Sequence, residues 1–389
     1  MDGQESWFDW NAIFNPNLRV MRKLGLWPEG KQSYKLDLYT LYATLMVILF
    51  AAYPTFSEYV AIYYVKDLQS VVAIIFVSLF DLMGPIKIYF IIRKTSVIKK
   101  CMENFKSEWF QPKNRVQKIR IEENFKLWKF VFKLLYTSCF SLIFFSFLPL
   151  VLGEREKTPY VMWLPFSFDR SPYFELVYFY QIFCAIYLCL VHVSVDTTIF
   201  GLKVCIGCQF DMLSDNLRRF ASVADSSRKC TALENFKNCA IQHREILKFL
   251  ENCKQFFDII LFWHLIISGI SIGITMFRLT LLEPLSNEFL SIMWYGIAIT
   301  SEISMYCWFG NEVEVKSNLV SYAAFESNWT SLPNNVKRSL MLFTQSLTKP
   351  VKISVFNLFT LSLETFKRIM KTAWSYFALL TQLNSTQLN

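Results

Sequence analysis

The sequence predicts an all-α membrane protein with seven transmembrane helices. Hydrophobic residues make up 53% of the 389 residues and the mean hydropathy is +0.30, which indicates that lipid is the solvent for much of the chain. Seven apolar segments are each long enough to cross about 30 Å of hydrocarbon as a helix. The Lys and Arg residues gather in alternate connections. An open strand edge in lipid would leave backbone groups unpaired, so helices are the expected spanning elements.

The predicted elements follow in order along the chain. Residues 1–38 contain charges and no apolar run of signal-peptide length, so they are expected to form a cytosolic N-terminal segment. Helices one to four occupy residues 39–202, helices five and six occupy residues 256–310, and helix seven occupies residues 353–383. The expected spans are Tyr39–Val60, Leu68–Ile92, Phe130–Leu152, Tyr173–Leu202, Phe256–Phe277, Phe289–Gly310 and Ile353–Leu383.

Two of the connections, residues 203–255 and residues 311–352, have a helical pattern of their own. The fifth helix is expected to begin well outside the membrane, because apolar side chains recur at roughly helical spacing among charges in residues 235–260. These apolar side chains are Phe236, Ala240, Ile241, Ile246, Leu247, Leu250 and Phe257. The two connections together are expected to build a helical cytosolic layer.

The distribution of positive charge predicts the orientation. Residues 1–38, 91–126, 203–255 and 311–353 hold 5, 10, 9 and 5 Lys and Arg residues, 29 in all, whereas the opposite connections hold 5. By the positive-inside rule the N-terminus is cytosolic, and an odd number of spans makes residues 384–389 an extracellular tail. The net charge of +9 therefore reflects mainly topology and does not indicate nucleic-acid binding.

The last span carries a polar stripe. Its members recur at steps of three and four and so share one helix face: Glu364, Lys367, Arg368, Lys371, Ser375, Leu379, Gln382 and Leu383. A face that is polar for most of a span must meet protein or water. Leu379 and Leu383 lie one turn apart with Gln382 beside them, either as packing residues or as part of a leucine ring that closes a pore by dewetting.

The C-terminal quarter resembles the insect odorant receptors. The similar stretches are CWFGNEVEVKSNLVSYAAFESNWTSLP (307–333), VKRSLMLFTQSLTKPVKISVFNLFTLSLETF (336–366) and TAWSYFALLTQL (372–383), with weaker similarity in LPFSFDRSPYFELVYFYQ (164–181) and IQHREILKF (241–249). The predicted topology is similar over the whole chain. A long insertion that the shared co-receptor Orco carries between its fourth and fifth helices is missing, which favours a ligand-tuning subunit.

The resemblance implies a function and partners. It implies a subunit of a tetrameric, ligand-gated, non-selective cation channel, in which an anchor layer of cytosolic helices joins the subunits and helix seven lines the pore. The expected partners are Orco subunits in a heterotetramer, membrane lipid and a volatile hydrophobic odorant. The expected location is the plasma membrane of the olfactory sensory neuron dendrite. No cofactor, metal or nucleic acid is implied.

The resemblance also places the gate at Leu379, Gln382 and Leu383. One feature fits less easily, because Lys367, Arg368 and Lys371 are positive charges near a pore for cations. Either only some of the four subunits carry these charges, or the side chains extend to lipid phosphates at the inner surface.

The ligand is expected in the outer halves of helices two, three, four and six. A volatile odorant binds through buried apolar area, at about 25 cal/mol per Å², and through one or two polar contacts. The candidates are Phe76, Val77, Phe80, Ser141, Phe144, Phe145, Phe174, Tyr178, Gln181, Ile182, Trp294, Tyr295 and Ala298. Among them, Ser141, Tyr178 and Gln181 are candidate partners for an ester, ketone or alcohol oxygen. The alternative is that these aromatic residues pack against lipid or belt the interface.

Other polar residues within the spans have simpler interpretations. His192 and Asp196 lie four apart and are expected to make an interhelical polar contact, and Lys87 and Glu302 are expected inside the bundle. Cys205 and Cys208 lack the second pair that a zinc ribbon requires. The chain has no P-loop, dinucleotide fingerprint or hydrolase elbow, so no enzymatic function is expected.

Two alternative functions remain open at this stage. A G-protein-coupled receptor also has seven spans, but its N-terminus faces outward, against the charge distribution. A gustatory-type channel of the same superfamily would act as a homotetramer without a co-receptor. The C-terminal stretch SYFALLTQL favours the odorant branch.

Overall fold

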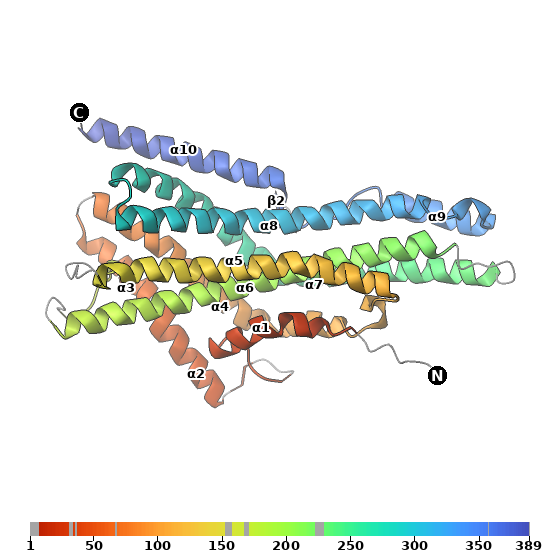
Figure 1. The fold of residues 1–389 in the computed structure, drawn as a ribbon, viewed down its shortest axis with the longest axis horizontal. Coiled ribbons are helices and arrows are strands. Elements are labelled where there is room, and N and C mark those ends of the chain that lie inside the picture. Colours follow the sequence, from red (N-terminus) through yellow and green to blue (C-terminus); the bar gives the residue numbers. More distant parts are fainter. Residues whose placement is uncertain are drawn as a thin grey trace.

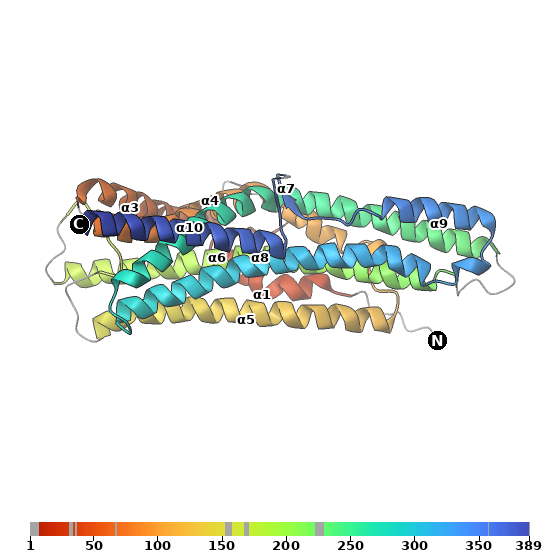
Figure 2. The same ribbon diagram turned by 90° about the horizontal axis from the view of Figure 1, so that it is seen from above.

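The fold is taken from a computed structural model of the chain. The structure describes all residues except 1–7, 31–33, 36, 67, 152–157, 167–170, 222–228, 357 and 389. Within the described residues the chain is a bundle of long helices that run along one common axis, as Figure 1 and Figure 2 show. The prediction of an all-α fold is confirmed.

The first half of the bundle begins with a short helix that packs inward. Helix α1 (Trp10–Lys23) lies against the later helix α6, where the Asn17 side-chain amide donates hydrogen bonds of 2.7 Å to the Ser194 carbonyl and to Thr198 Oγ1. Ser194 and Thr198 belong to the predicted fourth span, so the N-terminal segment, which was expected to be cytosolic, packs against the bundle.

The first predicted span is a composite helix. It consists of α2 (Leu38–Val47), the π-helical turn η1 (Ile48–Ala52) and α3 (Tyr53–Tyr64). Pro54 at the start of α3 has no N–H to donate to the preceding turn, which is a common cause of an altered hydrogen-bond pattern at this point.

The next five helices are all longer than a membrane span. They are α4 (Leu68–Asn104), α5 (Arg115–Val151), α6 (Tyr173–Arg219), α7 (Lys229–Leu281) and α8 (Asn287–Phe325), with a 3-10 turn η2 (Glu108–Phe110) before α5. Each continues beyond the predicted apolar segment. The prediction that the fifth helix begins well before its span is therefore confirmed.

The extensions meet at one end of the bundle and form a second small core. A 3-10 turn η3 (Trp329–Ser331) leads into α9 (Asn334–Ser346), which lies beside the first part of α7 in Figure 2. The core contains Phe220, Ala221, Ala232, Phe236, Ala324, Leu332, Val336 and Leu340. We call this end the anchor end, and its existence confirms the predicted helical layer.

The last predicted span begins later than expected. A short antiparallel hairpin precedes it, in which β1 (Ser354–Val355) pairs with β2 (Phe359–Thr360). Helix α10 (Leu363–Leu388) starts only after this hairpin, so the prediction that the span begins at Ile353 is wrong. The hairpin fixes the entry of α10, because Leu361 lies so close to Gly310 of α8 that a Cβ at Gly310 would meet its Cβ and carbonyl at 2.5 Å.

Four of the described helical stretches meet a strict test of length and hydropathy for crossing a membrane. They are Leu38–Tyr64, Ser70–Asn104, Tyr173–Arg219 and Ala232–Leu281. The other three predicted spans also lie on long helices, which are α5, α8 and α10. All seven predicted spans thus coincide with helices over most of their length.

Candidate functional site

A narrow cavity lies inside the bundle between α4, α6, α7 and α8. Its apolar lining consists of Phe80, Met83, Ile267 and Ile299, and its polar lining consists of His192, His264, Ser268, Ser271, Tyr295 and Glu302. The space between these side chains is only large enough for about one water molecule. A larger ligand would therefore have to displace side chains as it enters.

Aromatic rings form one wall of this cavity. The Phe80 ring stacks on the His192 ring at 4.2 Å and meets the edge of the Tyr295 ring at 5.7 Å. Phe76, one turn away on α4, makes an edge contact with Tyr295 at 4.6 Å, and the Arg278 guanidinium lies 5.1 Å from the Phe76 ring centroid. These rings supply polarizable apolar surface. The side chains of His192, Tyr295 and Arg278, each of which also carries a polar group, contact them.

Three polar groups of the cavity have no hydrogen-bond partner within the described part of the chain. They are both ring nitrogens of His192, the hydroxyl of Ser271 and the hydroxyl of Tyr295, all of which are buried. The hydroxyls of Ser271 and Tyr295 lie near each other but without the geometry of a hydrogen bond. A buried polar group that lacks a partner costs about 1–3 kcal/mol. The cavity therefore presents unsatisfied hydrogen-bonding capacity, which is unusual in a packed interior.

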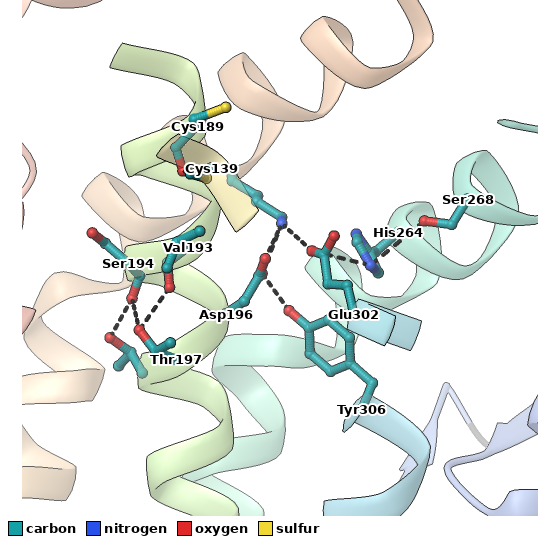
Figure 3. A network of polar contacts seen from close by, with 12 residues as sticks. Cys139, Cys189, Val193, Ser194, Asp196, Thr197, His264, Ser268, Glu302 and Tyr306 are labelled. Carbon is teal, nitrogen blue, oxygen red and sulfur yellow. Dashed lines mark hydrogen bonds and ion pairs between the residues drawn. The ribbon is translucent and has the colours of Figure 1, made fainter. Parts of the chain in front are cut away.

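A charged network forms the floor of the cavity (Figure 3). Lys87 of α4 binds both carboxylate oxygens of Asp196 on α6, with Nζ–O distances of 2.7 and 2.8 Å. The same ammonium contacts Glu302 Oε1 of α8 at 3.2 Å. Tyr306 donates its hydroxyl to Asp196, and His264 Nε2 of α7 lies 3.3 Å from Glu302 Oε1. Four helices thus meet at one polar junction.

The network is isolated from solvent. The side chains of Lys87 and Asp196 are 0% and 2% exposed. A second buried lysine, Lys203, donates to the Tyr306 carbonyl at 3.2 Å, and its Nζ lies 4.8 Å from the centroid of the Tyr306 ring. Buried charges are tolerated only when they are paired and hydrogen-bonded, and this network satisfies both conditions.

Cavity and network are stacked along α8. Tyr295, Ile299, Glu302 and Tyr306 recur at steps of three and four, so they lie one above another on a single helix face. The first three line the cavity, and the last two belong to the network. A shift of α8 at the cavity would therefore also move the side chains of Glu302 and Tyr306 in the charged network.

Some of the predicted ligand residues lie at this cavity and some do not. Phe80 and Tyr295 line it, and Phe76 contacts Tyr295. Val77, Trp294 and Ala298 are half-buried on the same two helices, outside the set that lines the cavity.

The remaining predicted ligand residues lie elsewhere. Phe174, Tyr178 and Ile182 form a separate apolar cluster, and Gln181 donates to the Tyr160 carbonyl at 3.1 Å. Ser141 donates to the Thr137 carbonyl of its own helix, and Phe144 is 61% exposed. The side chain of Phe145 lies outside the described residues. The structure thus divides the predicted set into two groups on different parts of the bundle.

Half of the polar lining, namely His264, Ser268 and Ser271, was missed by sequence reasoning. His192 and Asp196 were expected to make an interhelical polar contact. Asp196 does so with Lys87 and Tyr306, whereas His192 stacks on the Phe80 ring of α4. The expectation that Lys87 and Glu302 lie inside the bundle is confirmed. The sequence signal for the missed residues is only that polar groups occur at helical spacing within apolar spans, at His264, Ser268 and Ser271 on α7.

The helix α10 exposes the predicted polar stripe. Among the described side chains of α10, Thr365 and Ala373 are the buried ones, so its contact face is narrow. The stripe residues Glu364, Lys367, Arg368, Lys371, Ser375, Leu379 and Gln382 are all exposed on the other side. Leu379 is 57% exposed. The side chain of Leu383 lies outside the described residues.

His243 lies in the stretch IQHREILKF that resembles the odorant receptors, and it is placed at the anchor end. His243 packs between the rings of Phe210 and Phe343, and burial lowers the pKa of its imidazole. Cys205 and Cys208 are buried free thiols on α6. No group of three or more His, Cys, Asp or Glu side chains suited to a metal ion occurs among the residues that the structure describes.

Comparison with known proteins places the chain in a family. The sequence profile described as 7tm Odorant receptor matches residues 67–374. The chain is 23% identical to Odorant receptor Or1 of Anopheles gambiae, over 97% of each chain, and 21% identical to Odorant receptor 94a of Drosophila melanogaster, over 95% of this chain and 96% of the other.

The fold is similar to that of a solved receptor. The olfactory receptor OR5 from Machilis hrabei superposes with a TM-score of 0.84 at 17% identity, and its complex with eugenol with a TM-score of 0.80 at 16% identity. Each comparison covers 97% of this chain and 100% of the other. With its seven-helix membrane fold and a family profile that spans most of its length, this chain belongs to the insect odorant receptor family.

Proposed function

We propose that the chain is the odorant-binding subunit of a ligand-gated, non-selective cation channel, in which α10 lines the pore. The observation that carries this proposal is the exposure of α10 in a single subunit. Its polar and leucine-bearing stripe faces away from the bundle, as described above. A helix that is half polar along a span needs water or protein beside it, which a pore surrounded by several subunits supplies.

Exposed apolar residues at several positions around α10 support an assembly of subunits. Trp374, Tyr376 and Leu379 are 59%, 41% and 57% exposed. Such a surface on a membrane helix is covered by lipid, by neighbouring helices or by a closed hydrophobic gate. We assign the gate to Leu379, Gln382 and Leu383, and we assign the neighbours to Orco subunits in a heterotetramer.

The contact between α7 and α10 supplies a route from the cavity to the pore. One face of α7 lines the cavity with His264, Ser268 and Ser271. Another face carries Gly273, where a Cβ would meet Tyr376 Cβ at 2.8 Å and the Ala373 carbonyl at 3.1 Å. Because the two backbones approach so closely here, we propose that displacement of α7 by a ligand moves α10.

The ligand is proposed to be a small volatile organic molecule bound in the cavity beside Phe80. The solved receptor OR5 of Machilis hrabei is described in complex with eugenol, and its fold is similar to this one. Apolar side chains combined with convergent polar groups, as in this cavity, are typical of a small-molecule site. The narrow space fits a resting state that rearranges when the ligand enters.

The proposed orientation places the anchor end in the cytosol. The positive-inside asymmetry of the connections supports this orientation, with residues 384–389 outside. The proposed location is the plasma membrane of the olfactory sensory neuron dendrite. A G-protein-coupled receptor would show the opposite orientation, which epitope tags at both ends distinguish.

Electrical recording tests the proposal. The chain is expressed with Orco, and currents are recorded during exposure to volatile alcohols, esters and terpenoids. We expect odorant-evoked cation currents that this chain confers and that Orco alone does not show. Absence of such currents, with the protein at the surface and an Orco agonist still effective, would contradict the proposal. Robust currents from this chain alone would instead favour the gustatory-type homotetramer.

Substitutions in α10 test the gate within the same system. Leu379→Ala and Leu383→Ala are expected to raise the leak current, because each removes apolar surface from the constriction, and Gln382→Ala is expected to alter ion selectivity. Leu176→Ala is the matched control, since Leu176 is 63% exposed on α6. Unchanged leak and selectivity in all three α10 variants would show that these residues only pack.

A further substitution tests the coupling route. Gly273→Leu is expected to weaken or abolish opening, because the added side chain must displace Tyr376. Gly269→Ala is the control, since a Cβ there meets only Ile369 Cγ2 at the ordinary distance of 3.6 Å. Equal odorant responses in the two variants would remove α7 as the transmitting element.

A further inference from the structure

We propose that the cavity is specific for ligands that carry a hydroxyl group, namely small ring-bearing alcohols or phenols. This inference rests on the proposed function and names the ligand class of the same cavity. Its basis is the set of three polar groups, on His192, Ser271 and Tyr295, that have no partner in the described chain.

The three groups come from three different helices and face a common space. His192 belongs to α6, Ser271 to α7 and Tyr295 to α8, and all three line the cavity. His192 is 4% exposed and Ser271 is 0% exposed, so solvent does not serve as their partner. The rings of His192 and Tyr295 flank the same Phe80 ring on two sides. A single ligand group near Phe80 is therefore within the reach of more than one of them.

The hydrogen-bonding capacity of these groups selects the ligand group. A neutral histidine offers one donor and one acceptor, and the hydroxyls of serine and tyrosine each offer both. A ligand hydroxyl donates once and accepts twice, so it can satisfy all three groups at once. An ether, ester or ketone oxygen only accepts, and a hydrocarbon does neither, so both leave buried polar groups unpaired.

The charged floor argues against ionic ligands. Glu302 lines the cavity, so a carboxylate ligand would meet a like charge. An ammonium ligand would meet Lys87, whose Nζ already lies 3.2 Å from Glu302 Oε1, and Glu302 is also 3.3 Å from His264 (Figure 3). The Glu302 carboxylate that a cationic ligand would need is thus already bound to Lys87 and His264. The polar group of the ligand is therefore expected to be neutral.

The rest of the lining indicates the body of the ligand. Phe80, Met83, Ile267 and Ile299 are apolar, and Phe76 extends the aromatic wall through Tyr295. Stacked or edge-on contacts with such rings favour a flat or cyclic body, and the thioether of Met83 adapts to its shape. The expected ligand is thus a compact ring with one hydroxyl.

Matched sets of volatiles test this specificity in the chain expressed with Orco. Each set keeps one body and changes one group: benzyl alcohol, benzyl methyl ether, ethylbenzene and benzylamine, with the corresponding cyclohexylmethyl and para-ethylphenyl sets. We expect the hydroxyl member of at least one set to evoke current at a concentration at least tenfold lower than the ether, hydrocarbon and amine of that set. Equal or better responses to ethers, hydrocarbons or amines, or silence to every set from a channel that other volatiles open, would overturn the inference.

Substitutions separate recognition from structure. Tyr295→Phe and Ser271→Ala each remove one hydroxyl, and each is expected to raise the EC50 of the hydroxyl ligand about threefold to tenfold. The same variants should change the EC50 of the matched ether or hydrocarbon less than twofold, which a purely structural role would not produce. Tyr89→Phe, at an exposed tyrosine of α4, is the control. An equal shift for all ligands of a set would also overturn the inference.

The outcomes distinguish this inference from the proposed function. If esters or hydrocarbons open the channel and hydroxyl ligands have no advantage, the channel proposal stands and the specificity fails. If no volatile opens it while an Orco agonist does, the proposed function itself fails and the inference fails with it.

Discussion

Two polar networks in this chain use the same groups in different surroundings. In the bundle, Lys87 binds Asp196 and Glu302 with side chains that are almost wholly buried. At the anchor end, Lys316 Nζ contacts Asp211 Oδ2 at 2.7 Å and Asn124 Oδ1 at 2.8 Å, and the side chains of Lys316 and Asp211 are 14% and 19% exposed. The distances are nearly equal, so the difference between the networks lies in their access to water.

This difference indicates what each network does. Near the surface, water shares the task of solvating charge, so losing one partner has a moderate effect. Inside the bundle, the carboxylates of Asp196 and Glu302 without the lysine would keep only their contacts with Tyr306 and His264, and the penalty is several kcal/mol. The anchor network therefore joins helices through contacts that water can replace at moderate cost. In the bundle network the contacts are all made or the cost is large, so α4, α6, α7 and α8 have few stable relative positions. Such a junction is suited to the floor of a ligand cavity, because it has few intermediate arrangements.

The largest expected effect comes from breaking the bundle network. Lys87→Met leaves Asp196 and Glu302 without their ammonium, so we expect a loss of about 3–5 kcal/mol of stability. Thermal unfolding of the detergent-solubilised protein measures it, and surface delivery should fall as well. A melting temperature close to that of the unaltered chain would show that the carboxylates are solvated in some other way.

A smaller effect is expected when the charges are removed together. The triple variant Lys87→Met, Asp196→Asn and Glu302→Gln has no unpaired ion and keeps amide groups for Tyr306 and His264. We expect it to recover at least about half of the loss of the single variant. The same melting experiment compares the two. A triple variant less stable than Lys87→Met would mean that the network stabilises the bundle through net attraction.

At the anchor end, Lys316→Met should have a moderate effect of about 1–2 kcal/mol. The lysine stem also packs near Gly207, with Cδ at 3.2 Å from the position of a Cβ, and methionine keeps most of that contact. Melting curves at low and high salt provide the measurement, and the loss should shrink as salt rises. A loss as large as that of Lys87→Met would erase the distinction between the two networks.

The smallest effect is expected for Arg218→Ala. Arg218 pairs with Glu326 at the anchor end, but their side chains are 36% and 54% exposed. Solvent screening limits such a pair to about 0.5 kcal/mol or less. The melting temperature should stay nearly constant, and a drop comparable to that of Lys316→Met would show that this pair acts as part of a larger network.

The predicted ligand residues show that the sequence did not determine which aromatic side chains line the cavity. Phe80 and Tyr295 were predicted and line the cavity, whereas Phe174 and Tyr178 were chosen on the same grounds and lie in another cluster. All four are aromatic residues within predicted spans. The rotation of each helix about its axis separates them, and periodicity within one helix does not fix that rotation when every face is apolar.

By itself, the sequence determined which segments are helices, how long the apolar segments are and that two of the connections extend these helices, because those features follow from local hydrophobic periodicity. Only the tertiary structure decided which polar groups meet. Lys87 is 109 positions from Asp196 and 215 from Glu302, and the hairpin before α10 forms against Gly310 of a different helix. Partners so far apart are chosen by helix packing, in which a buried charge must find its counter-charge on a neighbouring helix, and a single-sequence pattern carries no record of which helix becomes the neighbour.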